Sequence, residues 1–174
     1  MRNSNNVTFD SKRSKELVER LDNLLADYSI FYMNTRGFHW NIKGDLFFEL
    51  HVKFEELYKH LSKRIDQIAE RISSLGLTPT HSYSDYLNIS EIPEIRNVSD
   101  THEAVTEVSK ALKLLIIKQR EIVMLAKDIN DEATATLLSN YMIQQEKLVW
   151  MYTSFLGNGS QHTTKNKRRA EMIA

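Results

Sequence analysis

The sequence predicts an all-α protein, a four-helix bundle with one long crossover between its second and third helices. Apolar residues recur every three or four positions over four long stretches, which is the period of helices buried on one face. Glycine occurs 5 times and proline 2 times in 174 residues, too rarely for a turn-rich sandwich or barrel. This length suits one domain with a sizeable core.

The first two helices are predicted to be joined by a short turn. The first runs from Asp10 to about Gly37, where the segment FHWNIK should leave the helix. The second runs from about Asp45 to Leu75, and Gly76 is a natural stop. Their apolar positions are Leu17, Leu21, Leu24, Leu25, Tyr28, Phe31 and Tyr32, then Leu50, Phe54, Leu57, Leu61, Ile65, Ile68 and Ile72.

The crossover is predicted over residues 76–98, which hold both prolines and have weak periodicity. A short helix is expected there, near Ser84–Leu87. Ser99 or Asp100 caps the third long helix, and Glu103 stands in capping-box spacing from Asp100.

The fourth helix is predicted from about Glu132 to Leu156, after a break near Asn130, with Gly157 as its end. Short, long and short connections between four helices are those of a ferritin-like bundle. We therefore expect three parts: a flexible N-terminal arm, the bundle domain and a flexible basic tail, at residues 1–9, 10–157 and 158–174.

The charge of the chain is unevenly distributed. The 23 basic and 23 acidic residues cancel, yet residues 1–15 and 157–174 each carry +3 and residues 16–156 carry −6. Chance and solubility explain this pattern as well as function does. The absence of cysteine excludes disulfides, thiolate zinc sites and iron–sulfur clusters. No apolar leader or long apolar run occurs, so we expect a cytoplasmic protein without a membrane partner.

The histidines argue against a metal site of the usual kind within the bundle. Ferritin-like bundles commonly build a di-iron site from Glu-x-x-His pairs on facing helices. None of the 6 histidines has a glutamate three positions earlier. The usual site inside one bundle is therefore not predicted.

A different set of ligands is predicted along the second helix. His51 and Glu55 are four residues apart and share a helix face, as do Asp66 and Glu70 further along. Imidazole and carboxylate groups suit iron, manganese or zinc. The 15 residues from His51 to Asp66 span about 22 Å of helix, too far for one metal ion.

A two-fold axis near residues 58–59 would bring the two pairs of ligands together between two chains. Two antiparallel copies of the helix would place His51 of one chain beside Asp66 of the other, twice over. His39 would join His51 from the turn before the helix. Two unrelated polar surface patches are the alternative interpretation of the same spacing.

The segment RGFHWNIKGDLFFELHVKFEELYKHLSKRIDQIAERISSLG, residues 36–76, resembles the signature of the Dps family (DNA-binding protein from starved cells, the mini-ferritins). The spacing of His39, His51, Asp66 and Glu70 matches that family's iron-binding motif. The resemblance continues through EKLVWM, residues 146–151, and covers about residues 10–157.

The resemblance implies a ferroxidase and a shell of twelve identical subunits with its centres at two-fold interfaces. Such proteins oxidise Fe(II), preferably with hydrogen peroxide, and store a ferric mineral, which protects the cell from oxidative damage. Each inter-subunit site has room for two metal positions. His39, His51, Asp66 and Glu70 would be ligands, and Glu55 a ligand or a water-bridged neighbour. Trp40 would be the near-site aromatic, with core packing as its alternative.

The family also suggests an iron-uptake pore and a DNA contact. Asp128, Asp131 and Glu132 would line a three-fold pore, although helix capping explains them equally well. A nucleoid-compacting structural protein is the alternative function, with DNA as partner of the basic ends. The DNA-contacting residues would be Lys12, Arg13, Lys15, Lys165, Lys167, Arg168 and Arg169.

Overall fold

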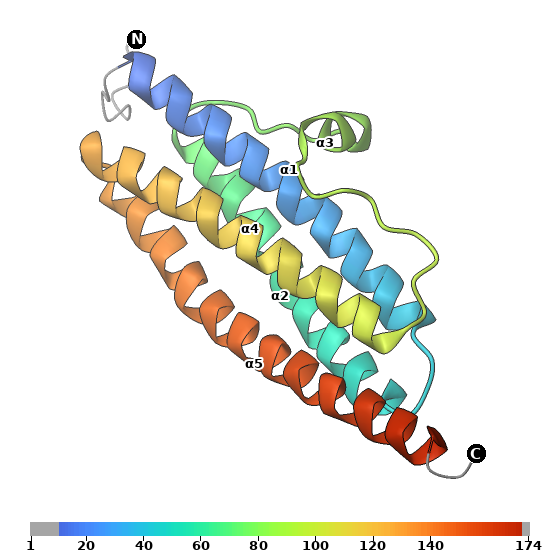
Figure 1. Cartoon of the computed structure of the whole chain (residues 1–174). Helices are drawn as coiled ribbons and strands as arrows, with labels where there is room; N and C mark the ends of the chain where they lie inside the picture. Colours follow the sequence, from blue (N-terminus) through green and yellow to red (C-terminus); the bar gives the residue numbers. More distant parts are fainter. Residues whose placement is uncertain (1–10, 172–174) are drawn as a thin grey trace.

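The described part of the chain contains four long helices and one short helix (Figure 1). The computed structural model describes the backbone of residues 11–171 and the side chains of residues 12–157. The predicted all-α bundle with a short helix on its crossover is confirmed. The helices are α1 (Ser11–Asn41), α2 (Phe47–Ser74), α3 (Tyr83–Ile89), α4 (Thr101–Asp128) and α5 (Glu132–Glu171).

Helices that follow one another across a short turn run antiparallel. Tyr32 of α1 contacts Tyr58 of α2, and Phe38 of α1 contacts Phe54 of α2. Later residues of α1 thus pair with earlier residues of α2. Helices α4 and α5 pair in the same way. Because α1 is also antiparallel to α4, helices α2 and α4 point in the same direction. The connection between α2 and α4 must therefore return along the whole bundle (Figure 1).

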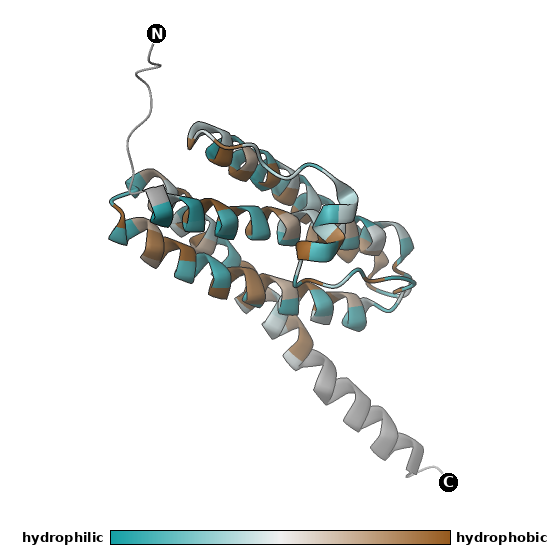
Figure 2. Ribbon diagram, turned by 90° about the horizontal axis from the view of Figure 1, so that it is seen from above, coloured by the Kyte–Doolittle hydropathy of each residue, from teal (hydrophilic) through white to brown (hydrophobic). Residues whose placement is uncertain are grey.

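The core fills the space between the four long helices. Each helix alternates hydrophobic and hydrophilic segments, as expected for a helix with one buried face (Figure 2). The core centre also holds a polar network, in which Gln145 donates to the Tyr28 hydroxyl and Gln119 donates to Gln145. Burial raises the pKa of Tyr28 to about 12. The largest fully buried side chains are Tyr28, Phe31, Phe54, Leu17, Leu21, Leu24, Leu25, Ile42, Leu61, Ile68, Ile72 and Leu112.

The crossover is held against α1 by side chains that satisfy its backbone groups. The Thr80 N–H donates to Asp22 at 2.8 Å. Further along, Asn34 donates to the Pro93 carbonyl and accepts from the Ile95 N–H, both at 2.9 Å. These contacts replace hydrogen bonds that an irregular segment would otherwise make to water.

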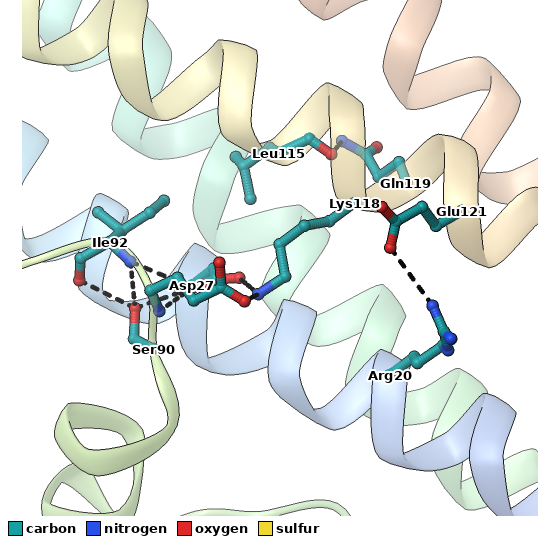
Figure 3. Close-up of polar contacts among 9 residues, drawn as sticks. Arg20, Asp27, Ser90, Ile92, Leu115, Lys118, Gln119 and Glu121 are labelled. Atoms are coloured by element: carbon teal, nitrogen blue, oxygen red, sulfur yellow. Dashed lines mark hydrogen bonds and ion pairs between the residues drawn. The ribbon is translucent and has the colours of Figure 1, made fainter.

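Asp27 is the strongest of these anchors (Figure 3). Its side chain is fully buried, accepts from the Ser90 hydroxyl and the Glu91 N–H, and forms an ion pair with Lys118 of α4. Lys118 also meets Glu91 at 3.0 Å. Burial lowers the pKa of Lys118, but the hydrogen bonds and charges of Asp27 and Glu91 outweigh this effect and raise it.

Two predicted helix boundaries are confirmed by their capping contacts. Helix α2 ends in a Schellman turn, in which Gly76 adopts φ +85° and Leu77 donates to the Ile72 carbonyl. Asp100 caps α4 by accepting from the Glu103 N–H at 2.7 Å.

Two other predicted boundaries are wrong. Helix α1 does not stop at Gly37 but continues to Asn41, and α5 continues past Gly157 to Glu171. A glycine in a helix interior costs about 1 kcal/mol relative to alanine, which a long helix tolerates when its neighbours are packed. The chain turns instead at Gly44, whose φ is +107°.

The predicted terminal segments lie largely outside the residues that the structure describes. Residues 1–9 lie outside the described residues, and the side chains of residues 158–174 are not described. The three predicted parts of the chain therefore stay a prediction. Within the described part of the chain, none of the helices is both long and apolar enough to cross a membrane.

Replacing Asp27 with alanine is expected to loosen the crossover. The change leaves Lys118 with Glu91 as its remaining acidic partner and removes the acceptor of three crossover donors, on Ser90, Glu91 and Ile92, which typically costs about 3–5 kcal/mol. We expect a lower midpoint of thermal unfolding and faster proteolysis within residues 76–98. Glu94→Ala, which removes an exposed ion pair in the same segment, is the control and should change neither measurement. Equal effects of the two variants would contradict the anchoring role.

Candidate metal centre

His39 and His51 face one another where α1 ends and α2 begins. Their rings stack with centroids 3.8 Å apart. The Nδ1 of His39 donates to the backbone carbonyl of His51 at 2.8 Å, and the Nδ1 of His51 donates to the carbonyl of His39 at 2.9 Å. Only 8% of His39 is exposed, so these reciprocal bonds hold its ring in a nearly closed site.

These bonds determine which ring nitrogens are free. A carbonyl oxygen accepts but cannot donate, so each Nδ1 carries a proton. In the neutral ring, the Nε2 of each histidine then keeps its lone pair. Histidines that bind metals are commonly oriented in this way, by a hydrogen bond from the nitrogen that does not bind.

Glu55 lies one helical turn beyond His51, on the same side of α2. The Lys59 ammonium donates to its carboxylate and forms an ion pair with it. That contact lowers the pKa of Glu55, and the nearby His39 and His51 lower it further. Because Glu55 follows His51 by four residues, the two side chains share one face of α2. We call His39, His51 and Glu55 the imidazole half-site.

Aromatic rings and one arginine surround the imidazole half-site. Tyr58 meets the His39 ring edge-on at 5.4 Å. The Arg36 guanidinium lies 4.7 Å from the Trp40 ring centroid and donates to the Tyr32 hydroxyl. Trp40 is 54% exposed, which excludes core packing within the chain as its role.

Asp66 and Glu70 lie elsewhere on α2 and form a second group, the carboxylate half-site. Both are exposed, and neither has a hydrogen bond or ion pair within the residues whose side chains are described. Helix α2 is continuous from Phe47 to Ser74, so the rise from His51 to Asp66 is about 22 Å. One chain thus brings His39 and His51 together, with Glu55 one helical turn away, and keeps Asp66 and Glu70 apart from them. No three acidic or histidine side chains among the described residues converge on a metal-sized site.

The three predicted pore residues differ in their surroundings. Asp131 precedes α5, and its carboxylate accepts from Arg71 at 2.7 Å and from the Thr134 N–H at 3.1 Å. Burial would raise its pKa, but these hydrogen bonds and the Arg71 charge lower it. Asp131 therefore caps its helix. Asp128 and Glu132 are exposed, and their role in a pore stays a prediction.

The basic residues that the structure describes near the N-terminal end, Lys12, Arg13 and Lys15, are exposed. Arg13 lies 3.9 Å from Asp128, while Lys12 and Lys15 are on the surface of α1. The predicted DNA contacts of the other end lie outside the residues with described side chains: Lys165, Lys167, Arg168 and Arg169.

The family model of a ferritin-like domain matches residues 18–161. The chain is 39% identical over 139 residues to the DNA protection during starvation protein of Porphyromonas gingivalis, which covers 80% of this chain and 87% of that protein. The chain belongs to the Dps family.

Two further relatives of this Dps chain match it over most of their length. An uncharacterized protein of Haemophilus influenzae is 50% identical over 146 residues, 84% of this chain and 91% of that protein. The crystal structure of a Dps protein from Vibrio cholerae O1 matches with a TM-score of 0.84 at 45% identity, covering 86% of this chain and 94% of that one. That protein is described as a member of a broad superfamily of ferritin-like diiron-carboxylate proteins.

The sequence-based interpretation missed three neighbours of the imidazole half-site in this Dps chain. Lys59 stands four residues after Glu55, which is the usual spacing of an ion pair on a helix. Tyr58 stands seven residues after His51 and so shares its face. Arg36 stands four residues from Trp40. Helical spacing alone therefore carried a usable signal for all three.

The hydrogen bonds of the two histidines predict their tautomers. Solid-state ¹⁵N NMR of the assembled protein should show His39 and His51 with a protonated Nδ1 and an unprotonated Nε2 when the rings are neutral. His81, whose ring also bonds a carbonyl but which is exposed, serves as a comparison in the same spectrum. A proton on Nε2 of either site histidine would contradict the proposed orientation.

Proposed function

We propose that this Dps protein is a ferroxidase that oxidises Fe(II), preferably with hydrogen peroxide, and stores the ferric product within a shell of twelve subunits. The observation that carries the proposal is the division of ligands on α2. The imidazole half-site and the carboxylate half-site complement one another chemically, and about 22 Å of continuous helix separates them.

Pairing of two chains supplies what one chain lacks. The midpoint between His51 and Asp66 falls at Tyr58 and Lys59, near the middle of α2. A two-fold axis there brings each imidazole half-site to the carboxylate half-site of the other chain, and forms two equivalent centres. Asp66 and Glu70 are exposed on their own chain, as this pairing requires.

The donor atoms fit the proposed substrate. Two imidazole nitrogens with several carboxylate oxygens suit Fe(II), and they leave room for water or peroxide. One hydrogen peroxide takes one electron from each of two Fe(II) ions and two protons, and leaves as two waters. No nucleophilic side chain is needed, because the chain only holds the ions and orients them. Manganese and zinc are the competing ions that the same ligands accept.

Mixed shells would test the division of the centre between two chains. His39→Ala/His51→Ala and Asp66→Ala/Glu70→Ala are each expected to assemble and to lose fast peroxide-driven iron oxidation. When the two variants are co-expressed with different tags, mixed pairs regain one of their two centres. Random pairing then restores about one quarter of the sites, and stopped-flow absorbance of ferric product should show this fraction of the wild-type rate.

His81→Ala, which removes an exposed imidazole of the crossover, is the matched control and should oxidise iron at the wild-type rate. Mixed shells that assemble but stay inactive would mean that the two groups of ligands do not complete one another between chains.

We also propose DNA binding as a second, separable function. It is favoured by the basic ends of the chain, +3 each, and by the naming of the Porphyromonas gingivalis relative for DNA protection. Many weak phosphate contacts on one shell would act together. The acidic body of the chain, −6 over residues 16–156, acts against this binding.

Removal of residues 158–174 is expected to abolish the DNA shift on a gel at low salt, because four cations per subunit are lost. Full-length protein with Lys165, Lys167, Arg168 and Arg169 all replaced by glutamine separates charge from length and should behave like the truncation. Each lost phosphate contact should reduce the salt slope by about 0.9. Full-length protein that never shifts DNA at low salt would refute this second function.

A further inference from the structure

A groove of about 390 Å³ lies between α2 and α5, on a different face of α2 from the two half-sites. Its polar wall is formed by Lys53, Glu56, His60 and Arg64 of α2 with Gln144 and Lys147 of α5. We call it the α2–α5 groove. It contains none of the residues assigned above to iron or DNA.

Arg64 is the unusual member of the α2–α5 groove, because it is a charged group that is only 5% exposed. Its Nη2 donates to the Gln144 side-chain oxygen at 2.7 Å, and its guanidinium lies 5.0 Å from the Tyr141 ring centroid. Its buried Nη1 has no acceptor within hydrogen-bond geometry among the described residues. A buried charge is normally paired with a group of opposite charge. No carboxylate among the residues with described side chains forms an ion pair with this guanidinium.

The other charges of the groove do not supply that counter-anion. The one carboxylate, Glu56, is paired with Lys53 at 2.7 Å. Lys147 is exposed and has neither a hydrogen bond nor an ion pair within residues 12–157. His60 adds an exposed imidazole to the same wall. The α2–α5 groove therefore has an excess of positive charge at two points, Arg64 and Lys147.

The donors of the groove also suit an oxyanion in their chemistry. The side-chain oxygen of Gln144 accepts from Arg64, and its amide nitrogen has no acceptor among the residues with described side chains. A guanidinium, an ammonium and an amide are all hydrogen-bond donors, and phosphate offers acceptor oxygens to match them. A metal cation is disfavoured there by the charge of Arg64 and Lys147.

We propose that the α2–α5 groove binds a phosphate group, held by Arg64 and Lys147. The phosphate has two sources with the same chemistry, free inorganic phosphate and the backbone of DNA. This proposal does not rest on iron oxidation, because the half-sites lie on another face of the helix.

Binding of inorganic phosphate to the assembled full-length protein is the test, measured by isothermal titration calorimetry at low ionic strength. We expect saturable binding that Lys147→Met weakens by roughly tenfold, since a charge-assisted contact is lost. Lys113→Met, which removes an exposed lysine on α4 outside the groove, is the matched control and should leave binding unchanged. Arg64→Gln is expected to weaken binding further; Lys147 is exposed, so its variant serves even if the Arg64 variant fails to assemble.

A second arm separates the two sources of phosphate. Displacement of bound phosphate by a short DNA duplex, lost in Lys147→Met, would assign the groove to the DNA backbone. Phosphate binding that the duplex leaves unaffected would assign it to the free ion. Absence of saturable binding, or equal binding by the Lys147→Met and Lys113→Met variants, would overturn the proposal. Iron oxidation by Lys147→Met should equal that of the wild type, so failure of this proposal is distinguishable from failure of the ferroxidase proposal.

Discussion

The buried Asp27 carboxylate joins α1, α4 and the crossover at one point. Its oxygens satisfy backbone and hydroxyl donors of residues 90 and 91 and the ammonium of Lys118. This contact holds the returning chain along α1 and α4, so α4 can run in the direction of α2. Asp66 and Glu70 stay exposed on α2, although the crossover comes near Ser62 and Ile65 of the same helix. The anchor of the crossover thus fixes the path of the segment that passes beside the carboxylate half-site.

The helices of this protein were largely predictable because local signals and tertiary packing agree. Apolar periodicity predicted the four long helices, and Asp100 and Gly76 predicted two of their ends through chemistry that acts within one turn. The helix ends predicted at Gly37 and Gly157 were wrong for a physical reason. A glycine weakens a helix but does not end it, and helix length is decided by the packing of residues on both sides. Gly44 could be told from them only by its positive φ in the folded chain.

The ligands were predictable from spacing, whereas their surroundings were not. His39 and His51 are twelve residues apart, and their stacking depends on the angle between α1 and α2. That angle is a property of the whole helix pair. Asp131 combines both kinds of contact. Its helix-capping hydrogen bond to Thr134 is local, whereas Arg71, which also donates to its carboxylate, is sixty residues away in the sequence. Charge pairing across such distances cannot be inferred from helical period.

Because α2 is one continuous helix, a single newly synthesised subunit would be unable to oxidise iron under the proposed function. A newly made subunit carries the imidazole half-site near the start of this helix and the carboxylate half-site nearer its end, and neither group alone encloses a metal ion. Under the proposed function, a chain that has not found its partner has no competent redox centre. Oxidation would then begin only after two subunits have paired, so the onset of catalysis would be set by assembly and would need no separate regulator.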